Sequence, residues 1–267
     1  MSIRSLGNPS VRYNAVMSKT GTGAASQRPI PPGWYGDRGL YAGGTPGPSD
    51  VIDYITISST GNATDFGNLY SAHSGIGALS SGANGRAVFA GGSGNVDTMG
   101  YVTIGSPGNT TDFGNLTAGR YAPVGASSIT RGLFAGGAVP SEVTNIDYIT
   151  IATPGNGTDF GDLTTARYSF SGCAGDTRAV WGGGLTPSIT NVIDYVTIAN
   201  TGNATDFGDL DESRNNLGAS SAPSGGARGL FGGGTSPSNT DKIDYITIAS
   251  TGNAQDFGNL TSARAGT

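Results

Sequence analysis

The stretch IDYITIATPGNGTDFGDL, Ile146–Leu163, is written five times in this chain with small changes. The other copies begin at Ile52, Met99, Ile193 and Ile243. In every copy the tyrosine precedes the phenylalanine of the Asp-Phe pair by 12 residues, as Tyr148 precedes Phe160. Self-similarity at a period between 20 and 50 residues indicates a repeat architecture, so the fold depends on what one unit forms.

Each unit has a β pattern throughout. A short apolar run closed by glycines opens the units at Arg38, Arg86, Arg131, Arg178 and Arg228. The segment IDYITI alternates β-branched or aromatic residues with polar ones, TDFGDL does so more weakly, and a Gly-Asn turn joins the two as a hairpin. A fourth, small-residue strand is expected within stretches such as Tyr121–Thr130 and Asn215–Gly225. Four strands per unit without helical periodicity predict an all-β, five-bladed β-propeller of four-stranded antiparallel blades.

The expected division of the chain is a propeller over residues 28–267 and an extended N-terminal arm over residues 1–27. The last copy ends where a further innermost strand would start, and Pro32–Asp37 is predicted to supply that strand for the first blade. The arm is expected to serve anchoring and assembly, through Arg4, Arg12, Tyr13 and Met17.

The composition limits the kinds of catalysis and binding that are expected of this protein. Only 12% of the 267 residues are charged, and the chain has one histidine, one cysteine and a net charge of -5. Phosphate binding needs clustered Lys and Arg, so nucleic acid is not expected as a partner. No catalytic residue, metal site or cofactor is predicted. The sequence shows no signal-peptide core and no apolar stretch of membrane-spanning length, so membrane insertion is not expected.

The residues that could suggest catalysis or ion binding occupy positions that recur in every unit of the repeat. His73 stands where the other units have Arg120, Arg167, Arg214 and Arg264. These arginines and the strand-opening ones are expected to pair with aspartates or loop carbonyls, the alternative being an anion-binding ring at the channel. Cys173 and Trp181 are expected in the core. The repeated aspartates of IDY and TDF favour Asx turns over a calcium site, because the dense acidic spacing of an EF-hand is missing.

The features that differ between copies are better candidates for binding. The linkers after each glycine pair are rich in Pro, Ser and Thr and vary in length, which is typical of surface loops. The predicted contact residues for a partner or a glycan are Trp34, Tyr35, Pro46, Ser49, Asn95, Asp97, Ser141, Glu142, Ser188, Thr190, Ser238 and Asn239.

In its glycine pair, two aromatic strands and Thr/Ser-x-Arg segment, the unit resembles the kelch repeat over residues 38–267. It departs from that repeat in having Phe for the second aromatic and a longer Tyr-to-Phe spacing. The phrase ITIASTGNATDFGDL, a composite of the copies, and the segment SLGNPSVRYNAVMSKTGTGAA also look like virion proteins of tailed bacteriophages, including those of cyanobacteria.

This resemblance implies a non-enzymatic virion protein, assembled in the host cytoplasm and attached to tail, baseplate or capsid by its arm. Its expected partners are other virion proteins, further copies of itself and, at the host surface, a glycan. The alternative is a glycan-binding, lectin-like adhesin whose blades each offer a weak site. An enzyme is a more distant third reading.

Overall fold

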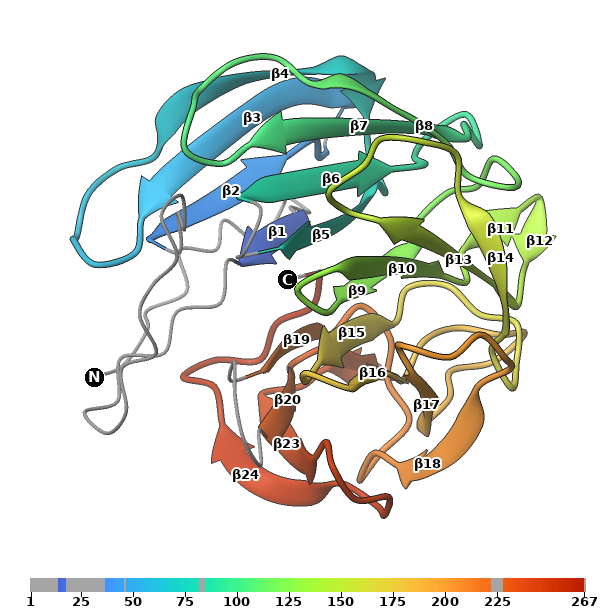
Figure 1. Ribbon diagram of the computed structural model, residues 1–267. Coiled ribbons are helices and arrows are strands. Elements are labelled where there is room, and N and C mark those ends of the chain that lie inside the picture. Colours follow the sequence, from blue (N-terminus) through green and yellow to red (C-terminus); the bar gives the residue numbers. More distant parts are fainter. Residues whose placement is uncertain (1–13, 18–36, 46, 82–84, 222–227, 267) are drawn as a thin grey trace, which may run out of the picture.

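A computed structural model describes residues 14–17, 37–45, 47–81, 85–221 and 228–266 of the 267-residue chain. The described residues form five four-stranded antiparallel sheets, which surround a common centre as the blades of a propeller (Figure 1). The predicted all-β, five-bladed fold is confirmed. In each blade the strands follow chain order from the centre outward, and neighbouring strands pair antiparallel.

The strand bounds show one blade pattern repeated. Blade 1 contains β1 (Asn14–Met17), β2 (Arg38–Ala42), β3 (Ser49–Thr56) and β4 (Thr64–His73). Blade 2 contains β5 (Gly77–Ser81), β6 (Arg86–Ala90), β7 (Thr98–Thr103) and β8 (Thr111–Asn115). Blade 3 contains β9 (Val124–Ser127), β10 (Arg131–Ala135), β13 (Asn145–Thr150) and β14 (Thr158–Asp162).

The remaining two blades follow the same order. Blade 4 contains β15 (Ser171–Ala174), β16 (Arg178–Gly182), β17 (Val192–Thr197) and β18 (Thr205–Asp209). Blade 5 contains β19 (Gly218–Ser221), β20 (Arg228–Gly232), β23 (Lys242–Thr247) and β24 (Gln255–Asn259). Two small hairpins lie in linkers: β11 (Ala138–Val139) with β12 (Ser141–Glu142), and β21 (Thr235–Ser236) with β22 (Ser238–Asn239).

The first prediction that fails concerns the innermost strand of blade 1. Asn14–Met17 pairs with β2 in this position, Met17 opposite Gly39, where Pro32–Asp37 was predicted. Of the latter stretch the structure describes only Asp37, which lies in a turn. The range predicted as an arm, 1–27, therefore contains a strand of blade 1. The remainder of that range lies outside the described residues, and so do Arg4, Arg12 and Tyr13.

The repeated phrase forms the outer hairpin of each blade. In blade 3 it is β13 and β14, whose register shifts by a bulge between Ile146 and Asp147. Tyr148 meets Phe160 edge to face with ring centroids 6.0 Å apart, and the Arg131 guanidinium lies 4.5 Å from the tyrosine ring centroid. All five blades repeat this Arg-Tyr-Phe stack. The fixed Tyr-to-Phe distance in the sequence therefore reflects one packed cross-strand pair.

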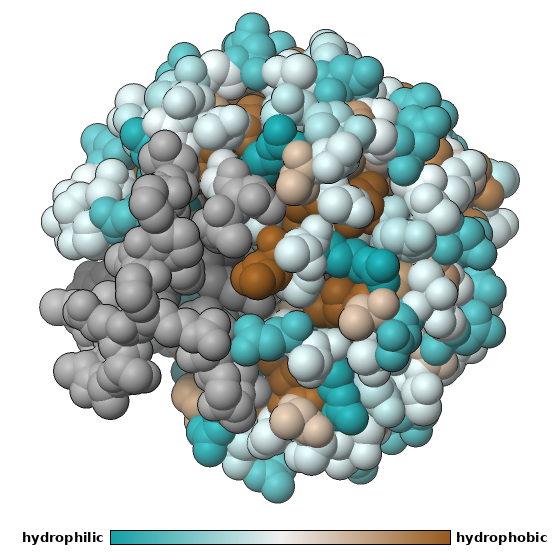
Figure 2. All heavy atoms as spheres, viewed as in Figure 1, coloured by the Kyte–Doolittle hydropathy of each residue, from teal (hydrophilic) through white to brown (hydrophobic). Residues whose placement is uncertain are grey.

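The core lies between neighbouring blades, and the inner strands crowd together near the axis. A Cβ atom at Gly125 would lie 2.0 Å from the carbonyl oxygen of Ala78 on the neighbouring inner strand, so only glycine fits there. Trp181 and Cys173 are buried, as predicted. In the space-filling view the periphery is mostly polar, and apolar residues show mainly toward the middle (Figure 2).

Neighbouring blades are joined by the turn of the repeated phrase. In blade 3 the Gly155 N–H donates to the carbonyl of Phe113 in blade 2, at 2.6 Å, and the Gly157 N–H donates to that of Asn115, at 2.7 Å. The side-chain oxygen of Asn156 accepts from the Asn115 N–H. The same three bonds recur at the junctions of blades 1 and 2, 3 and 4, and 4 and 5.

Candidate functional site

Three blade junctions contain a buried ion pair. The arginine follows the outermost strand of one blade, and the aspartate belongs to the third strand of the next. The pairs are Arg120–Asp147, Arg167–Asp194 and Arg214–Asp244, all with side chains at most 1% exposed. These arginines do not face solvent, so the position is structural, as the expected pairing with aspartates required.

The pair in the middle of the series shows how the charges are satisfied. Arg167 Nη2 lies 2.8 Å from Asp194, and the guanidinium also donates to the carbonyls of Val192 and Trp181, at 2.9 and 3.3 Å. Thr164 donates to the same carboxylate from its hydroxyl, at 2.6 Å, and from its backbone N–H, at 3.2 Å. Burial lowers the pKa of Arg167 below its ordinary value, while the attraction of Asp194 opposes the shift. A charge inside the protein needs such compensation.

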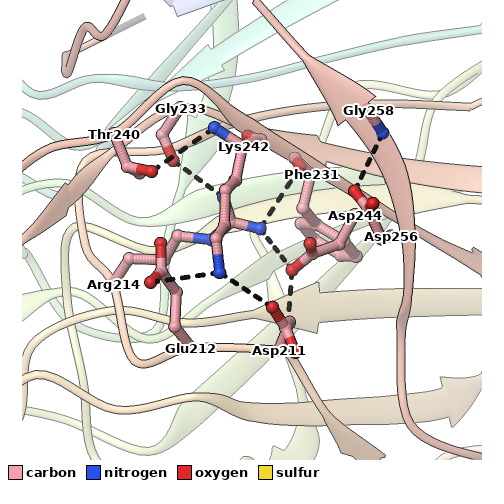
Figure 3. A network of polar contacts seen from close by, with 10 residues as sticks. All are labelled: Asp211, Glu212, Arg214, Phe231, Gly233, Thr240, Lys242, Asp244, Asp256 and Gly258. Atoms are coloured by element: carbon pink, nitrogen blue, oxygen red, sulfur yellow. Dashed lines mark hydrogen bonds and ion pairs between the residues drawn. The ribbon is translucent and has the colours of Figure 1, made fainter.

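The junction of blades 4 and 5 extends its pair to the surface, and the sequence interpretation missed this extension (Figure 3). Lys242 Nζ lies 2.9 Å from Asp211 and 3.5 Å from Glu212. The hydrogen bond to Lys242 lowers the pKa of Asp211, and its counterpart raises the pKa of Lys242. Burial raises the pKa of the neighbouring Asp244, against the attraction of Arg214. The sequence signal was available, since Asp211 and Glu212 occur where the other units have uncharged Thr, Tyr, Ser or Ala.

The junction of blades 1 and 2 lacks the ion pair because both partners are replaced. His73 occupies the arginine position, and Gly100 occupies that of the aspartate. The His73 ring nitrogens are 2.8 Å from the Ser71 hydroxyl and 3.1 Å from the Ser93 carbonyl. A cavity of about 30 Å³ lies beside His73 and Gly100, and it is also lined by Thr110, whose buried hydroxyl has no hydrogen-bond partner. About one or two waters fit this volume, which is too small for an organic substrate.

With one exception, the predicted contact residues that the structure describes are on the connections between the second and third strands. Ser141 and Glu142 form β12, and Ser238 and Asn239 form β22. Asn95, Asp97, Ser188 and Thr190 also lie on these connections, whereas Ser49 is the first residue of β3. Trp34, Tyr35 and Pro46 lie outside the described residues. We call this set of connections, residues 43–48, 91–97, 136–144, 183–191 and 233–241, the loop face.

The loop face lies at one end of the ring. The second strands of all blades run the same way relative to the axis, so their far ends share one face. The linkers of blades 3, 4 and 5 also pair with the segment that enters the same blade, as shown by the bridges Tyr121–Ala138, Tyr168–Leu185 and Asn215–Thr235. The side chains of Asn95, Ser141, Ser188 and Ser238 are exposed there. The predicted residues thus share a face without converging on one pocket.

The prediction of Asx turns holds for only some of the repeated aspartates. Asp112, Asp206 and Asp256 each accept a hydrogen bond from the backbone N–H two residues on, the Asx arrangement. For the IDY segment the prediction is wrong at Asp147, Asp194 and Asp244, because these side chains are buried at blade junctions and pair with arginines. Within the described ranges no group of three His, Cys, Asp or Glu side chains is placed to hold a metal ion. No helix among the described residues is long and apolar enough to cross a membrane.

No family model matches the sequence, and no curated protein is similar to it. The interpretation therefore depends on the geometry. Ionisable side chains at the junctions support the ring, whereas the exposed polar side chains that differ between blades lie on the loop face.

Proposed function

We propose that this protein is a non-enzymatic structural component of a tailed-bacteriophage particle, which uses the loop face to contact a neighbouring virion protein or the host surface. One observation carries the proposal. At three junctions the recurring arginine and the aspartate of the IDY segment hold neighbouring blades together, and the loop face is where the blades differ.

The placement of the variable loops supports a binding role over a catalytic one. Propeller enzymes gather several acidic, basic or aromatic groups at one mouth of the channel. On the described loop face the exposed side chains are hydroxyls and amides, such as Ser141, Ser188 and Asn239, together with prolines and the acidic Asp97, and they are spread around the ring. Broad contact by several adjustable loops on a rigid scaffold is typical of interaction surfaces.

A loop-face variant tests the proposal. Ser141→Lys, Ser188→Lys and Ser238→Lys together place three charges on exposed loop tips. The matched control is Thr130→Lys with Thr177→Lys, two exposed positions at the opposite end of the ring. Both proteins should fold, as circular dichroism would show. When each variant replaces the wild-type protein during assembly, only the loop-face variant should be missing from particles purified by density-gradient centrifugation.

The results separate the possible roles. Equal incorporation of both variants would exclude the loop face as the attachment surface. Wild-type protein that never bands with particles would contradict a virion role altogether. Binding of wild-type protein to a glycan array, lost in the loop-face variant, would favour the adhesin instead.

The strand β1 changes how the arm is tested. Removing residues 1–27 would delete the innermost strand of blade 1 and destabilise the ring, so it does not isolate the arm. Removing residues 1–13 leaves β1 in place. We expect the shorter deletion to retain the thermal transition of the full chain and to lose incorporation into particles. Normal incorporation would overturn the anchoring role of the arm.

A further inference from the structure

The ring has a seam between blade 5 and blade 1 at which the contacts of the other four junctions are missing. In Figure 1 the outer strands of blade 1 and blade 5 (β24) are not drawn side by side as the outer strands of the other neighbouring blades are. Among the described residues, blade 5 and blade 1 each have a repeat surface at the seam without the contacts of the other junctions.

Blade 5 has the residues that form a junction in the other blades, but at the seam no neighbouring blade covers them. Phe257 is 50% exposed, while its four counterparts Phe66, Phe113, Phe160 and Phe207 are each 2% exposed. Nothing lies within 4 Å of a Cβ atom built at Gly258, whereas at the equivalent Gly208 the carbonyl of the next turn is 2.6 Å away. Arg264 bonds only to Ser262 among the described residues, although its counterpart Arg214 pairs with an aspartate.

The blade 1 side is open in the complementary way. Ile57 is 43% exposed, and its counterparts Ile104, Ile151, Ile198 and Ile248 are at most 4% exposed. Ala63 is exposed, whereas the equivalent Thr110 of the closed blade 1–2 junction is buried. Asp53 has no ion-pair partner within the described part of the chain, while the equivalent Asp194 pairs with Arg167.

Both open surfaces keep the sequence of a working junction. At the blade 1–2 junction the lost arginine, His73, coincides with a lost aspartate, Gly100, which shows that the two positions change together. At the seam neither has changed, since Arg264 and Asp53 are both present. Exposed apolar side chains on an unpaired sheet edge promote association with another chain.

We propose that the seam is a docking site for one further blade of this repeat chemistry, supplied by a partner polypeptide. The four internal junctions define what such a blade must carry. Its Gly-Asn turn donates two N–H bonds to the carbonyls of Phe257 and Asn259, and its aspartate pairs with Arg264. On its other side, its outermost strand accepts the turn at Gly61, and its arginine pairs with Asp53.

A whole second copy of the chain does not fit this site. If its blade 1 docked on blade 5 with the geometry of an internal junction, its blade 2 would enter the place that blade 1 of the first copy already holds. A blade that meets both of these surfaces at once would complete the ring, and six blades lie within the range known for propellers. The inference comes from the internal junctions and holds whether or not the protein belongs to a virion.

A grafted blade tests the geometry. Gly266 bonds to Asn216 as Asn216 bonds to Ser169, so a copy of residues 170–216 attached after Gly266 continues the repeat in register. We expect the graft to fold and to slow the hydrogen exchange of the Gly61 and Ala63 amides to the rates of Gly108 and Thr110. The melting temperature should rise as well. A graft that exchanges like an unfolded chain and leaves these amides unprotected would overturn the proposal.

The matched control is a graft in which the copies of Gly202 and Ala204 carry Gly202→Pro and Ala204→Pro, which removes the two N–H donors. It should lose the gain in melting temperature. Equal stabilisation by both grafts would show that the turn is not what docks.

Cysteine pairs distinguish docking from closure of the five blades on themselves. Asn203→Cys with Asp162→Cys replaces residues bonded across a closed junction, where the Asp162 N–H lies 3.1 Å from the Asn203 side chain. This pair should form a disulfide under mild oxidation. The equivalent seam pair, Asn62→Cys with Asn259→Cys, should not. Cross-linking of the seam pair at the rate of the control would show that blade 1 itself fills the site, and the proposal would be wrong.

Discussion

Replacing Asp194 with alanine should cost about 3–5 kcal/mol of unfolding free energy, because it leaves a buried guanidinium without its counter-charge. Asp194 holds Arg167 at 2.8 Å and accepts two bonds from Thr164. Both side chains of the pair are fully buried. The carbonyls of Val192 and Trp181 stay bonded to the guanidinium but carry no charge to balance it.

This cost is a large fraction of the unfolding free energy of a typical protein, which is about 5–15 kcal/mol. Equilibrium unfolding in urea measures it. With a slope of about 3 kcal/mol per molar urea, the midpoint should fall by roughly 1–1.7 M.

A double-mutant cycle identifies the cause, and the chain supplies a precedent. The blade 1–2 junction has His73 in place of the arginine and no aspartate. Arg167→His combined with Asp194→Ala leaves no unpaired buried charge, so it should cost less than the two single changes added together, by about 3 kcal/mol. Simple additivity, or a cost below about 1 kcal/mol for Asp194→Ala alone, would refute the buried-charge reasoning.

Two further changes test the exceptional positions. Burial and the facing Asp65 raise the pKa of Asp53. Its ionisation therefore disfavours the folded state, and Asp53→Asn should stabilise the protein at pH 7; urea titrations should show that gain vanish once the pH falls below the ordinary value of 3.8. The combination His73→Arg, Gly100→Asp and Thr110→Ala should rebuild an ion pair in place of the cavity and raise the melting temperature. Without Thr110→Ala the gain should be smaller, because a Cβ atom at position 100 would lie 3.1 Å from that of Thr110.

The fold was predictable because the sequence repeats its packing. The constant spacing from Tyr148 to Phe160 corresponds to an edge-to-face pair across a hairpin, and this pair tolerates no insertion. Glycines in the small-residue strands correspond to a close approach at the axis, as at Gly125.

The innermost strand of blade 1 was not predictable in the same way. The inner strands of blades 2 to 5 read GALSS, VGAS, SGCA and GASS, while β1 reads NAVM and lacks their glycine and serine residues. Proximity to β2 in the sequence favoured Pro32–Asp37 as its inner neighbour, whereas the segment that pairs with β2 is Asn14–Met17. A connection of 20 residues costs little more entropy than a short one, so nearness in sequence is a weak guide to pairing.

The partners at the junctions lay between these two cases. The sequence marks arginine and aspartate positions but not which blade each faces, since the pairs join residues 27 or 30 positions apart across a blade boundary. His73 and Gly100 both depart from the repeat at the same junction, and this joint change could have identified the pairing, because two positions that change together are expected to touch.

The ends of the repeat array also argue for the role of the seam. In open repeat proteins the terminal units differ from the rest and carry a polar outer surface, which keeps the array soluble. Here the terminal blades keep the internal sequence, so Ile57 and Phe257 remain apolar although both are exposed. Exposed apolar side chains that keep an interface sequence promote association with another chain, as the proposed docking requires. The position of Phe257, opposite the Gly-Asn turn at every other junction, specifies the shape of what binds there.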